Sequence, residues 1–341
     1  MIDEQDLALV HALQVRPRAA WTELAEVLGC TPATAARRWE RLSRGGAAWV
    51  AAVPGPHASA FVAFVGLRCA AGRRRDVAAA LAEDPAAVTV EITAGGHELV
   101  VEVVAPDVAA FGRYLLDRVE RLPGVTSSSV TVATSIVGEA SRWRLDALDA
   151  GQLGELATAG PGRRPPRRPS DVDQRLLVEL GRDGRMPWHR LAERTGTSAA
   201  TARRRTERLL ASGEAVLRCD IAAPRFEWPV TTYLWCRVPA PDLDGVARSL
   251  TTASRVRFVA TLAGAHNLLV TAWLRAVEEV HRLEVDLAAR HPALEVLDRT
   301  ITLESPKRMG RVFDGTGLAV RTVPLGPWGH RADPSDPRDD E

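Results

Sequence analysis

The beginning of the chain alternates apolar positions with helix-ending residues. Apolar side chains recur at helical spacing over residues 3–14, which predicts a helix with one buried face; they are Leu7, Val10 and Leu13. A second helix is expected over residues 21–28, because Gly29 is a good C-terminal breaker. Thr31 then offers an N-cap hydroxyl, and Pro32 suits the first turn of a third helix. Two helices joined by a short glycine-containing turn are typical of a helix-turn-helix.

The third helix has a packing side and a polar side when its residues are placed 100° apart. The expected packing side consists of Ala35, Ala36, Trp39 and Leu42. The opposite stripe consists of Thr34, Arg37, Arg38 and Arg41. We therefore expect a helix that buries one face and presents arginines on the other.

The following segment mixes strand and helix patterns. Strands are expected at 61–69, 87–94, 98–105 and 125–137, and helices at 73–84 and 107–121. The two middle strands flank a Gly95-Gly96 turn. This β-α-β-β-α-β order predicts a ferredoxin-like sheet domain.

The whole pattern occurs twice. Displacing the chain by 167 residues aligns Trp21 with Trp188, and 14 of the 26 positions from Trp21 to Gly46 are then identical. In the sheet segments the displacement becomes 169, which aligns Gly95 with Gly264. The expected fold class is α+β, with two tandem units that each hold a winged-helix-like helix-turn-helix domain and a ferredoxin-like sheet domain.

The repeat sets the expected domain boundaries. Helix-turn-helix domains are expected at 1–53 and 170–222, ferredoxin-like effector and dimerisation domains at 54–138 and 223–304, a linker at 139–169 and a C-terminal tail at 305–341. Residues 139–157 could form one amphipathic helix, and 158–170 are rich in Pro, Gly and Arg, as linkers are. We expect the end of the tail, from about residue 324, to be disordered.

Charge is informative only locally. The 44 basic and 43 acidic residues give a net charge of +1, so no overall field commits the molecule to nucleic acid or membrane. Residues 31–45 and 198–212 nevertheless each carry a local charge of +3. A solvated arginine face is the alternative interpretation for a single helix. Recurrence of the same stripe behind the same turn favours contact with DNA.

Other residue types point to no further chemistry. The four cysteines, Cys30, Cys69, Cys219 and Cys236, are spread singly, so neither a disulfide framework nor a zinc site is expected. The acidic start does not resemble a signal peptide, and no apolar stretch approaches the roughly 20 residues of a membrane span. We expect a cytoplasmic protein without membrane contact, metal or cofactor.

A helix-turn-helix followed by this sheet resembles the Lrp/AsnC family of transcription regulators. The resemblance rests on TELAEVLGCTPATAARRWERLSRGG, HRLAERTGTSAATARRRTERLLASG, TAGGHELVVEV and LAGAHNLLVTA. It implies a sequence-specific regulator of double-stranded DNA that forms an intrachain pseudo-dimer and a homo-oligomer. The expected DNA contacts are Thr31, Thr34, Arg37, Arg38, Arg41, Ser198, Thr201, Arg204, Arg205 and Arg208.

The resemblance also implies a small effector, usually an amino acid, beside the glycine turns. The corresponding residues are Gly95, Gly96, His97, Glu98, Gly264, His266 and Asn267. The family pattern is roughly Gly-x-x-Asp, and here Glu98 and Asn267 stand at the acidic position. Because a carboxylate can hold an ammonium group, the first copy is expected to bind a zwitterion more tightly. The alternative is that Glu98 only solvates a strand end.

An enzyme is the rival hypothesis. Siroheme decarboxylases resemble the same two-part architecture and use histidines of the sheet domain. This sequence lacks the Tyr/Arg-rich histidine segment associated with them, and it has no Walker loop, GxSxG, HExxH or Rossmann fingerprint. We expect no catalytic residues; His97 and His266 are expected to be exposed or capping, and Trp21 and Trp188 to pack small helical cores.

Overall fold

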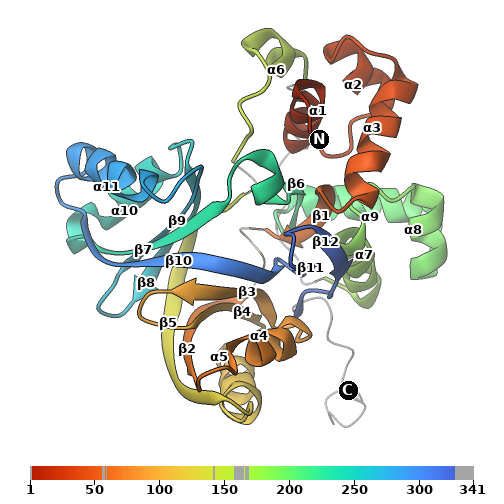
Figure 1. The fold of residues 1–341 in the computed structure, drawn as a ribbon. Helices are drawn as coiled ribbons and strands as arrows, with labels where there is room; N and C mark the ends of the chain where they lie inside the picture. Colours follow the sequence, from red (N-terminus) through yellow and green to blue (C-terminus); the bar gives the residue numbers. More distant parts are fainter. Residues whose placement is uncertain are drawn as a thin grey trace.

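The computed structural model describes residues 2–55, 58, 60–140, 143–156, 165 and 169–326. Two groups of helices lie on one side of the molecule, and a curved ring of strands with helices on its outside lies on the other (Figure 1). No helix in these ranges is both long and apolar enough to cross a membrane.

The two groups of helices are the heads. The first head consists of α1 (Glu4–Val15), α2 (Trp21–Val27) and α3 (Pro32–Arg44), and the second of α7 (Asp171–Arg182), α8 (Trp188–Thr195) and α9 (Ala199–Ala211). The buried side chains of α3 are Ala35, Trp39 and Leu42, and those of α9 are Ala202, Thr206 and Leu209. The predicted packing side is thus confirmed at these positions, while Ala36 is half-buried.

A strand follows each head, and the two strands pair with each other. Strand β1 (Ala48–Pro54) runs antiparallel to β6 (Ala215–Ile221), with Ala51 opposite Arg218. Neither strand has another partner among the described residues. This two-stranded sheet links the first half of the chain to the second directly beneath the heads.

Eight of the remaining strands form two four-stranded units within one larger sheet. The first contains β2 (Phe61–Cys69), β3 (Ala87–Ala94), β4 (Leu99–Ala105) and β5 (Val125–Gly138), in the order β3-β4-β2-β5. The second contains β7 (Val230–Arg237), β8 (Val256–Ala263), β9 (Leu268–Leu274) and β10 (Glu295–Arg308), in the order β8-β9-β7-β10. Both orders are ferredoxin-like, as the element pattern predicts.

The sheets join at both edges. Strand β5 pairs with β8, and β10 pairs with both β7 and β3, so the eight strands close into a ring. Closure removes the open edges of both sheets, which would otherwise be free to pair with other chains. The two copies therefore form an intrachain pseudo-dimer.

Helices cover the outer faces of the ring. The first sheet packs on α4 (Arg74–Ala82), α5 (Val108–Arg113) and the π-helical η1 (Tyr114–Val119). Of these, α5 and η1 occupy the range 107–121, where a single helix was predicted. The second packs on α10 (Ala240–Leu250) and α11 (Glu279–Arg290). A smaller cluster around Phe64 and Tyr233 lies between the two sheets.

The prediction of one helix over residues 139–157 is wrong. Among the described residues of that range, α6 (Ala150–Leu156) is the α-helix that forms. Residues 143–149 run without helix across the first head, where Trp143, Leu145 and Leu148 are buried. The imidazole Nδ1 of His11 accepts hydrogen bonds from the backbone N–H groups of residues 147 and 148, so the segment gains partners that a helix would not provide.

The predicted boundary between sheet domain and tail at residue 304 is also wrong. Strand β10 continues to Arg308, and β11 (Arg311–Phe313) and β12 (Ala319–Thr322) follow it in the same sheet. Lys307, the only lysine of the chain, is buried and donates to the carbonyl oxygen of Asp84 at 2.8 Å, which holds this extension on the first sheet. Disorder was expected from about residue 324, but residues 324–326 are described and Leu325 is buried there; positions 327–341 lie outside the described residues.

Candidate nucleic-acid interface

Helices α3 and α9 begin in the same way. The Thr31 hydroxyl oxygen accepts from the backbone N–H of Thr34 at 3.1 Å, and that of Ser198 accepts from the N–H of Thr201 at 3.2 Å. The side-chain hydroxyls of each pair also lie within hydrogen-bonding distance of each other. These four residues therefore fix the first turn of each helix, the part that a recognition helix directs at base edges.

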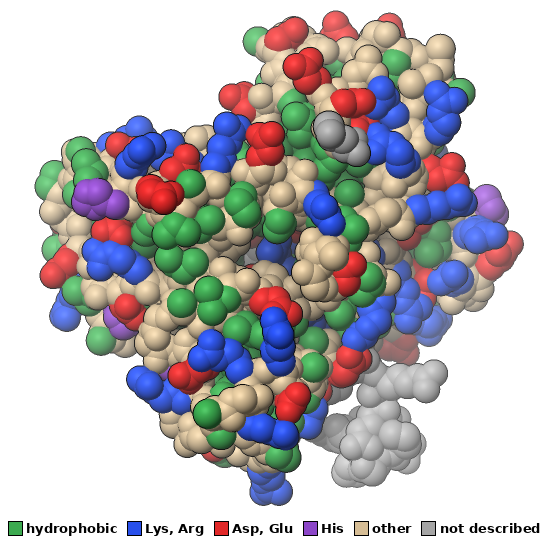
Figure 2. Space-filling view, in the orientation of Figure 1, with side chains coloured by type: hydrophobic (Ala, Val, Ile, Leu, Met, Phe, Trp, Pro, Cys, Tyr) green, Lys and Arg blue, Asp and Glu red, His purple; other side chains and the backbone are tan. Residues whose placement is uncertain are grey.

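One arginine on each helix is exposed and has no ion pair within the described part of the chain. Arg37 and Arg204 lie at equivalent positions, and neither makes an ion pair with any residue that the structure describes. Figure 2 shows basic side chains over α3 at the upper right of the molecule. Five guanidinium N–H donors are thus available on each helix for an external acceptor.

The neighbouring arginines have partners inside their own heads. In the first head, Arg38 Nη1 lies 2.9 Å and Arg41 Nη2 2.6 Å from carboxylate oxygens of Asp6 in α1. In the second head, Arg205 and Arg208 contact Asp173 of α7 at 3.1 and 2.6 Å. The four arginines were all predicted to contact DNA from the stripe alone. Their pairing favours a role in joining α1 to α3 and α7 to α9.

Both aspartates are buried. Asp6 and Asp173 have 0% and 1% of their surface exposed. Burial opposes ionisation of Asp173, but hydrogen bonds from Ser170, Arg208 and Arg205 more than offset it and lower its pKa. Hydrogen bonds to Asp3 and Asp6 raise the pKa of Arg38. A buried carboxylate left without its guanidinium partners would be strongly destabilising.

The two heads are joined by a reciprocal contact. The Arg18 guanidinium lies 3.8 Å from the ring centre of Trp188, and the Arg185 guanidinium 4.1 Å from that of Trp21. Arg18 also donates to the carbonyl oxygens of residues 184 and 186, and Arg185 to those of residues 17 and 19. We call these four side chains the head clamp. Each tryptophan also packs partly on its own head, as predicted.

The two arginines of the head clamp are largely buried. Burial lowers the pKa of both Arg18 and Arg185 to about 10, so both remain charged at neutral pH. Planar guanidinium stacking and two charge-assisted hydrogen bonds per arginine fix the relative orientation of the heads. The separation of α3 and α9 is therefore set within a single chain.

The glycine turns predicted to hold an effector occupy the strand ends. Gly95 and Gly264 have φ of 147° and 143°, which favours glycine. The Glu98 carboxylate accepts from the backbone N–H of Cys69 at 3.0 Å, and the Asn267 amide bonds the backbone N–H and carbonyl of Val238 at 2.9 and 2.7 Å. The polar groups expected to hold an effector therefore already have intramolecular partners.

The histidines of these turns are engaged as well. The His97 ring packs on Gly66, where an added Cβ would lie 2.6 Å from it, and burial lowers the pKa of His97. The His266 ring centre lies 5.9 Å from that of Trp235. Within the described ranges no three His, Cys, Asp or Glu residues are placed to hold a metal ion.

Comparison with known proteins agrees with this arrangement. The profile of the AsnC-type helix-turn-helix domain matches residues 2–43 and 170–210, and that of the Lrp/AsnC ligand binding domain matches residues 62–143. The chain belongs to the Lrp/AsnC family of DNA-binding transcription regulators.

Relatives of this Lrp/AsnC chain are about half its size. An uncharacterized HTH-type transcriptional regulator of Pyrococcus abyssi is 26% identical over 138 residues, which are 40% of this chain and 87% of the relative. A similarly named protein of Pyrococcus furiosus is 26% identical over 139 residues, 40% of this chain and 94% of its own length. The coverage fits a tandem form of the family.

Solved structures of a siroheme decarboxylase resemble nearly the whole chain. The siroheme decarboxylase NirDL superposes with a TM-score of 0.57 at 12% identity, covering 90% of this chain and 93% of the other. At this identity the likeness concerns the fold alone. It shows that two helix-turn-helix and sheet units in tandem are a known arrangement.

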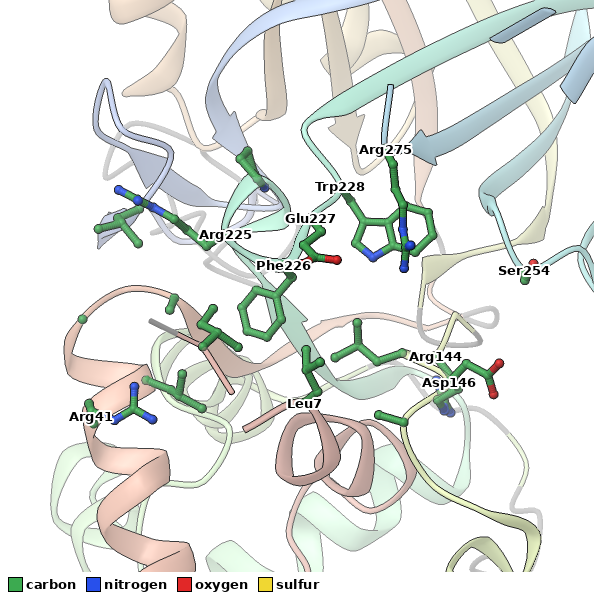
Figure 3. Close-up of a pocket in the computed structure, with 18 residues that line it drawn as sticks. Leu7, Arg41, Arg144, Asp146, Arg225, Phe226, Glu227, Trp228, Ser254 and Arg275 are labelled. Atoms are coloured by element: carbon green, nitrogen blue, oxygen red, sulfur yellow. The ribbon is translucent and has the colours of Figure 1, made fainter. Parts of the chain in front are cut away.

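A basic groove lies beside the first head of the Lrp/AsnC chain. It has a volume of about 870 Å³, and Phe226 and Trp228 project into it opposite α1 and the residue 144–147 segment (Figure 3). Arg41 of α3 lines its edge, and the Arg275 guanidinium lies 5.3 Å from the Trp228 ring centre. Arginines thus outnumber the acidic residues of the groove, Asp146 and Glu227, and the groove extends from α3 toward the second sheet.

Sequence reasoning missed the partners of the arginines. A displacement of 167 also aligns Asp6 with Asp173 and Arg18 with Arg185. These repeated charges in and beside α1 and α7 were the available signal for internal ion pairs and head contacts, because a charge that only meets solvent need not recur at the same place in both copies.

Proposed function

We propose that this Lrp/AsnC chain binds one operator with both heads, as the single-chain counterpart of a regulator dimer. The head clamp carries the proposal, because it holds two equivalent recognition helices in one fixed relation. A two-headed protein of this kind reads two half-sites whose spacing follows from its own geometry.

Arg37 and Arg204 are the proposed base-reading residues. Both are exposed, lie in the first half of a recognition helix and are free of ion pairs to the described residues, so they can donate to guanine O6 and N7 without losing an internal contact. Thr31, Thr34, Ser198 and Thr201 lie at the same helix ends and are proposed to approach the phosphates. Arg38, Arg41, Arg205 and Arg208 are proposed to contact DNA only secondarily, since each bonds a buried aspartate.

A small effector is the second part of the proposal. The matched ligand-binding domain supports it, and an amino acid is the class that the family resemblance implies. An effector can alter DNA affinity only if it binds two arrangements of the chain with different affinities. We further propose association of the chain with further copies of itself, which light scattering of the purified protein would test.

The test of DNA recognition is to sequence the fragments that co-purify with the full chain and then measure their affinity. The proposal expects enrichment of imperfect palindromes, bound at least a thousandfold more tightly than scrambled DNA. Fragments with no shared sequence would contradict it.

The proposal assigns no catalytic activity to the chain. The fold likeness to NirDL makes siroheme the appropriate control substrate. We expect the visible spectrum of siroheme to be unchanged on mixing with purified protein. Conversion of siroheme would overturn the non-enzymatic assignment.

A further inference from the structure

A chamber of about 610 Å³ lies between the two sheets, beneath the β1–β6 strand pair. Aromatic side chains from both sheets form part of its wall, namely Phe64, Tyr233, Phe258 and Trp273. The chamber is separate from the glycine turns. Its lining residues on β3, β4, β7 and β9 lie within the strands, whereas the turns lie at strand ends. A ligand there would be enclosed by both halves of the chain.

Charged residues line the chamber unequally. Its carboxylates Glu91, Glu102 and Glu139 belong to the first half of the chain, whereas its guanidiniums Arg218, Arg257 and Arg308 belong to the second half. None of the six has a residue of the same charge at the equivalent position of the other copy. The repeat is thus broken at this place, which gives the chamber an acidic and a basic side.

The basic side contains donors without acceptors. Arg218 has a side chain only 8% exposed; its Nη2 donates to Asp220 at 2.8 Å and its Nη1 lies 3.7 Å from the Glu139 carboxylate, but its Nε has no partner among the described residues. Arg308 donates from Nη2 to Ser305 at 3.1 Å, and its Nη1 is likewise without an acceptor. A buried N–H donor of a charged group is costly to leave without an acceptor. An oxygen atom of a bound ligand would satisfy both of these N–H groups.

The acidic side contains an incompletely paired carboxylate. Glu91 accepts from the hydroxyls of Thr302 and Ser305 and lies 3.7 Å from Arg308. Glu102 accepts only one described hydrogen bond, from the Thr89 hydroxyl at 3.0 Å. Burial raises the pKa of Glu102, and an ammonium group beside it would act in the opposite direction by favouring the charged carboxylate.

We propose that the chamber binds a zwitterion of the amino-acid class, with its carboxylate on Arg218 and Arg308, its ammonium on Glu102 and an apolar side chain against the aromatic wall. A polyanion would meet three carboxylates, and a simple cation would meet three guanidiniums. A compact molecule with one charge of each sign satisfies both sides.

The position of Arg218 connects the chamber to the heads. Strand β6 follows α9, and its partner β1 follows α3. Val53 and Val216 of the same strand pair also line the chamber. A ligand on Arg218 therefore contacts the element that carries both recognition helices; this regulatory consequence rests on the proposed function, whereas binding itself does not.

The test is calorimetry of the full chain against each of the twenty amino acids. At least one apolar or aromatic amino acid should bind, and Glu102→Gln should weaken its binding about tenfold to a hundredfold by removing the charge-assisted hydrogen bond. Glu304→Gln, on the exposed side of β10, is the matched control and should keep wild-type affinity. Ala133→Leu, which fills part of the chamber, should also abolish binding while thermal melting confirms that each variant is folded.

Two outcomes would overturn the chamber site. One is the absence of heat with all twenty amino acids. The other is affinity that falls with Glu98→Gln at the glycine turn and is unaffected by both Glu102→Gln and Ala133→Leu. An iron uroporphyrin that binds and is displaced by no amino acid would overturn the choice of ligand.

DNA binding by wild-type protein without amino acid is measured separately. If that binding fails while calorimetry succeeds, the proposed function is wrong and the chamber site stands. If both succeed, the factor by which the amino acid changes DNA affinity must equal the factor by which DNA changes amino-acid affinity.

Discussion

Removing Arg37 and Arg204 together should abolish operator discrimination and leave the fold intact. Neither side chain has an ion pair with the described residues, so Arg37→Ala with Arg204→Ala should change the free energy of unfolding by less than about 0.5 kcal/mol. A bidentate contact to guanine contributes ~1–3 kcal/mol of discrimination, so two contribute ~2–6 kcal/mol. Since 1.4 kcal/mol is tenfold, operator affinity should fall by about 30-fold to more than 10,000-fold.

The assay is fluorescence anisotropy of a labelled operator and of a scrambled fragment at one salt concentration. Affinity for the scrambled fragment should fall much less, because only two charges are lost. Arg38→Ala with Arg205→Ala is the matched control; each substitution should lower stability by about 1 kcal/mol, because the buried aspartates keep only one guanidinium partner each. Unchanged discrimination in the first variant, with loss confined to the control, would refute the assignment.

Three further predictions concern salt, pH and the head clamp. If the heads neutralise about six phosphates, operator affinity should fall on the order of a thousandfold between about 50 and 200 mM salt, and a flat response would exclude phosphate-driven binding. Burial lowers the pKa of His11 from 6.5 to about 4, so the unfolded state takes up a proton first as pH falls; about 3 kcal/mol of stability should be lost between pH 6.5 and 4 in denaturant titrations, and His11→Gln should flatten that loss. Arg18→Ala with Arg185→Ala should let the heads move independently, so that operators with altered half-site spacing bind nearly as well as the original; unchanged spacing selectivity would show that the clamp does not set it.

Local patterns predicted the elements well where one face of each is buried. Trp39 and Leu42 on α3 recur at helical spacing because the head has a single small core, and the turn residues Gly29 and Thr31 end and begin helices by their own backbone chemistry. The sheet domains were predictable for the same reason, because the outer helices pack on apolar faces of the strands. Such signals are contained within a few consecutive residues.

Long-range pairing was not predictable in this way. Nothing near Arg38 in the sequence indicates that Asp6 lies beneath it, and nothing near residue 308 indicates that β10 will pair with the first sheet. Residues 139–157 were predicted as one amphipathic helix, but the buried His11 nitrogen and the core of the first head hold residues 143–149 in another conformation. The charged residues of the chamber were not predicted as a site, because they lie far apart in the sequence and come together only when the ring of strands closes.

The central claim is that one chain carries two recognition heads locked at a fixed separation. Hydroxyl-radical footprinting of the full chain on a selected operator tests it most directly. The account predicts two protected half-sites of similar but unequal sequence, centred about 10 base pairs or a multiple apart on one face of the duplex, with protection lost from one half-site when about five base pairs are inserted between them. A single isolated half-site, or protection of both half-sites that survives the insertion, would contradict it.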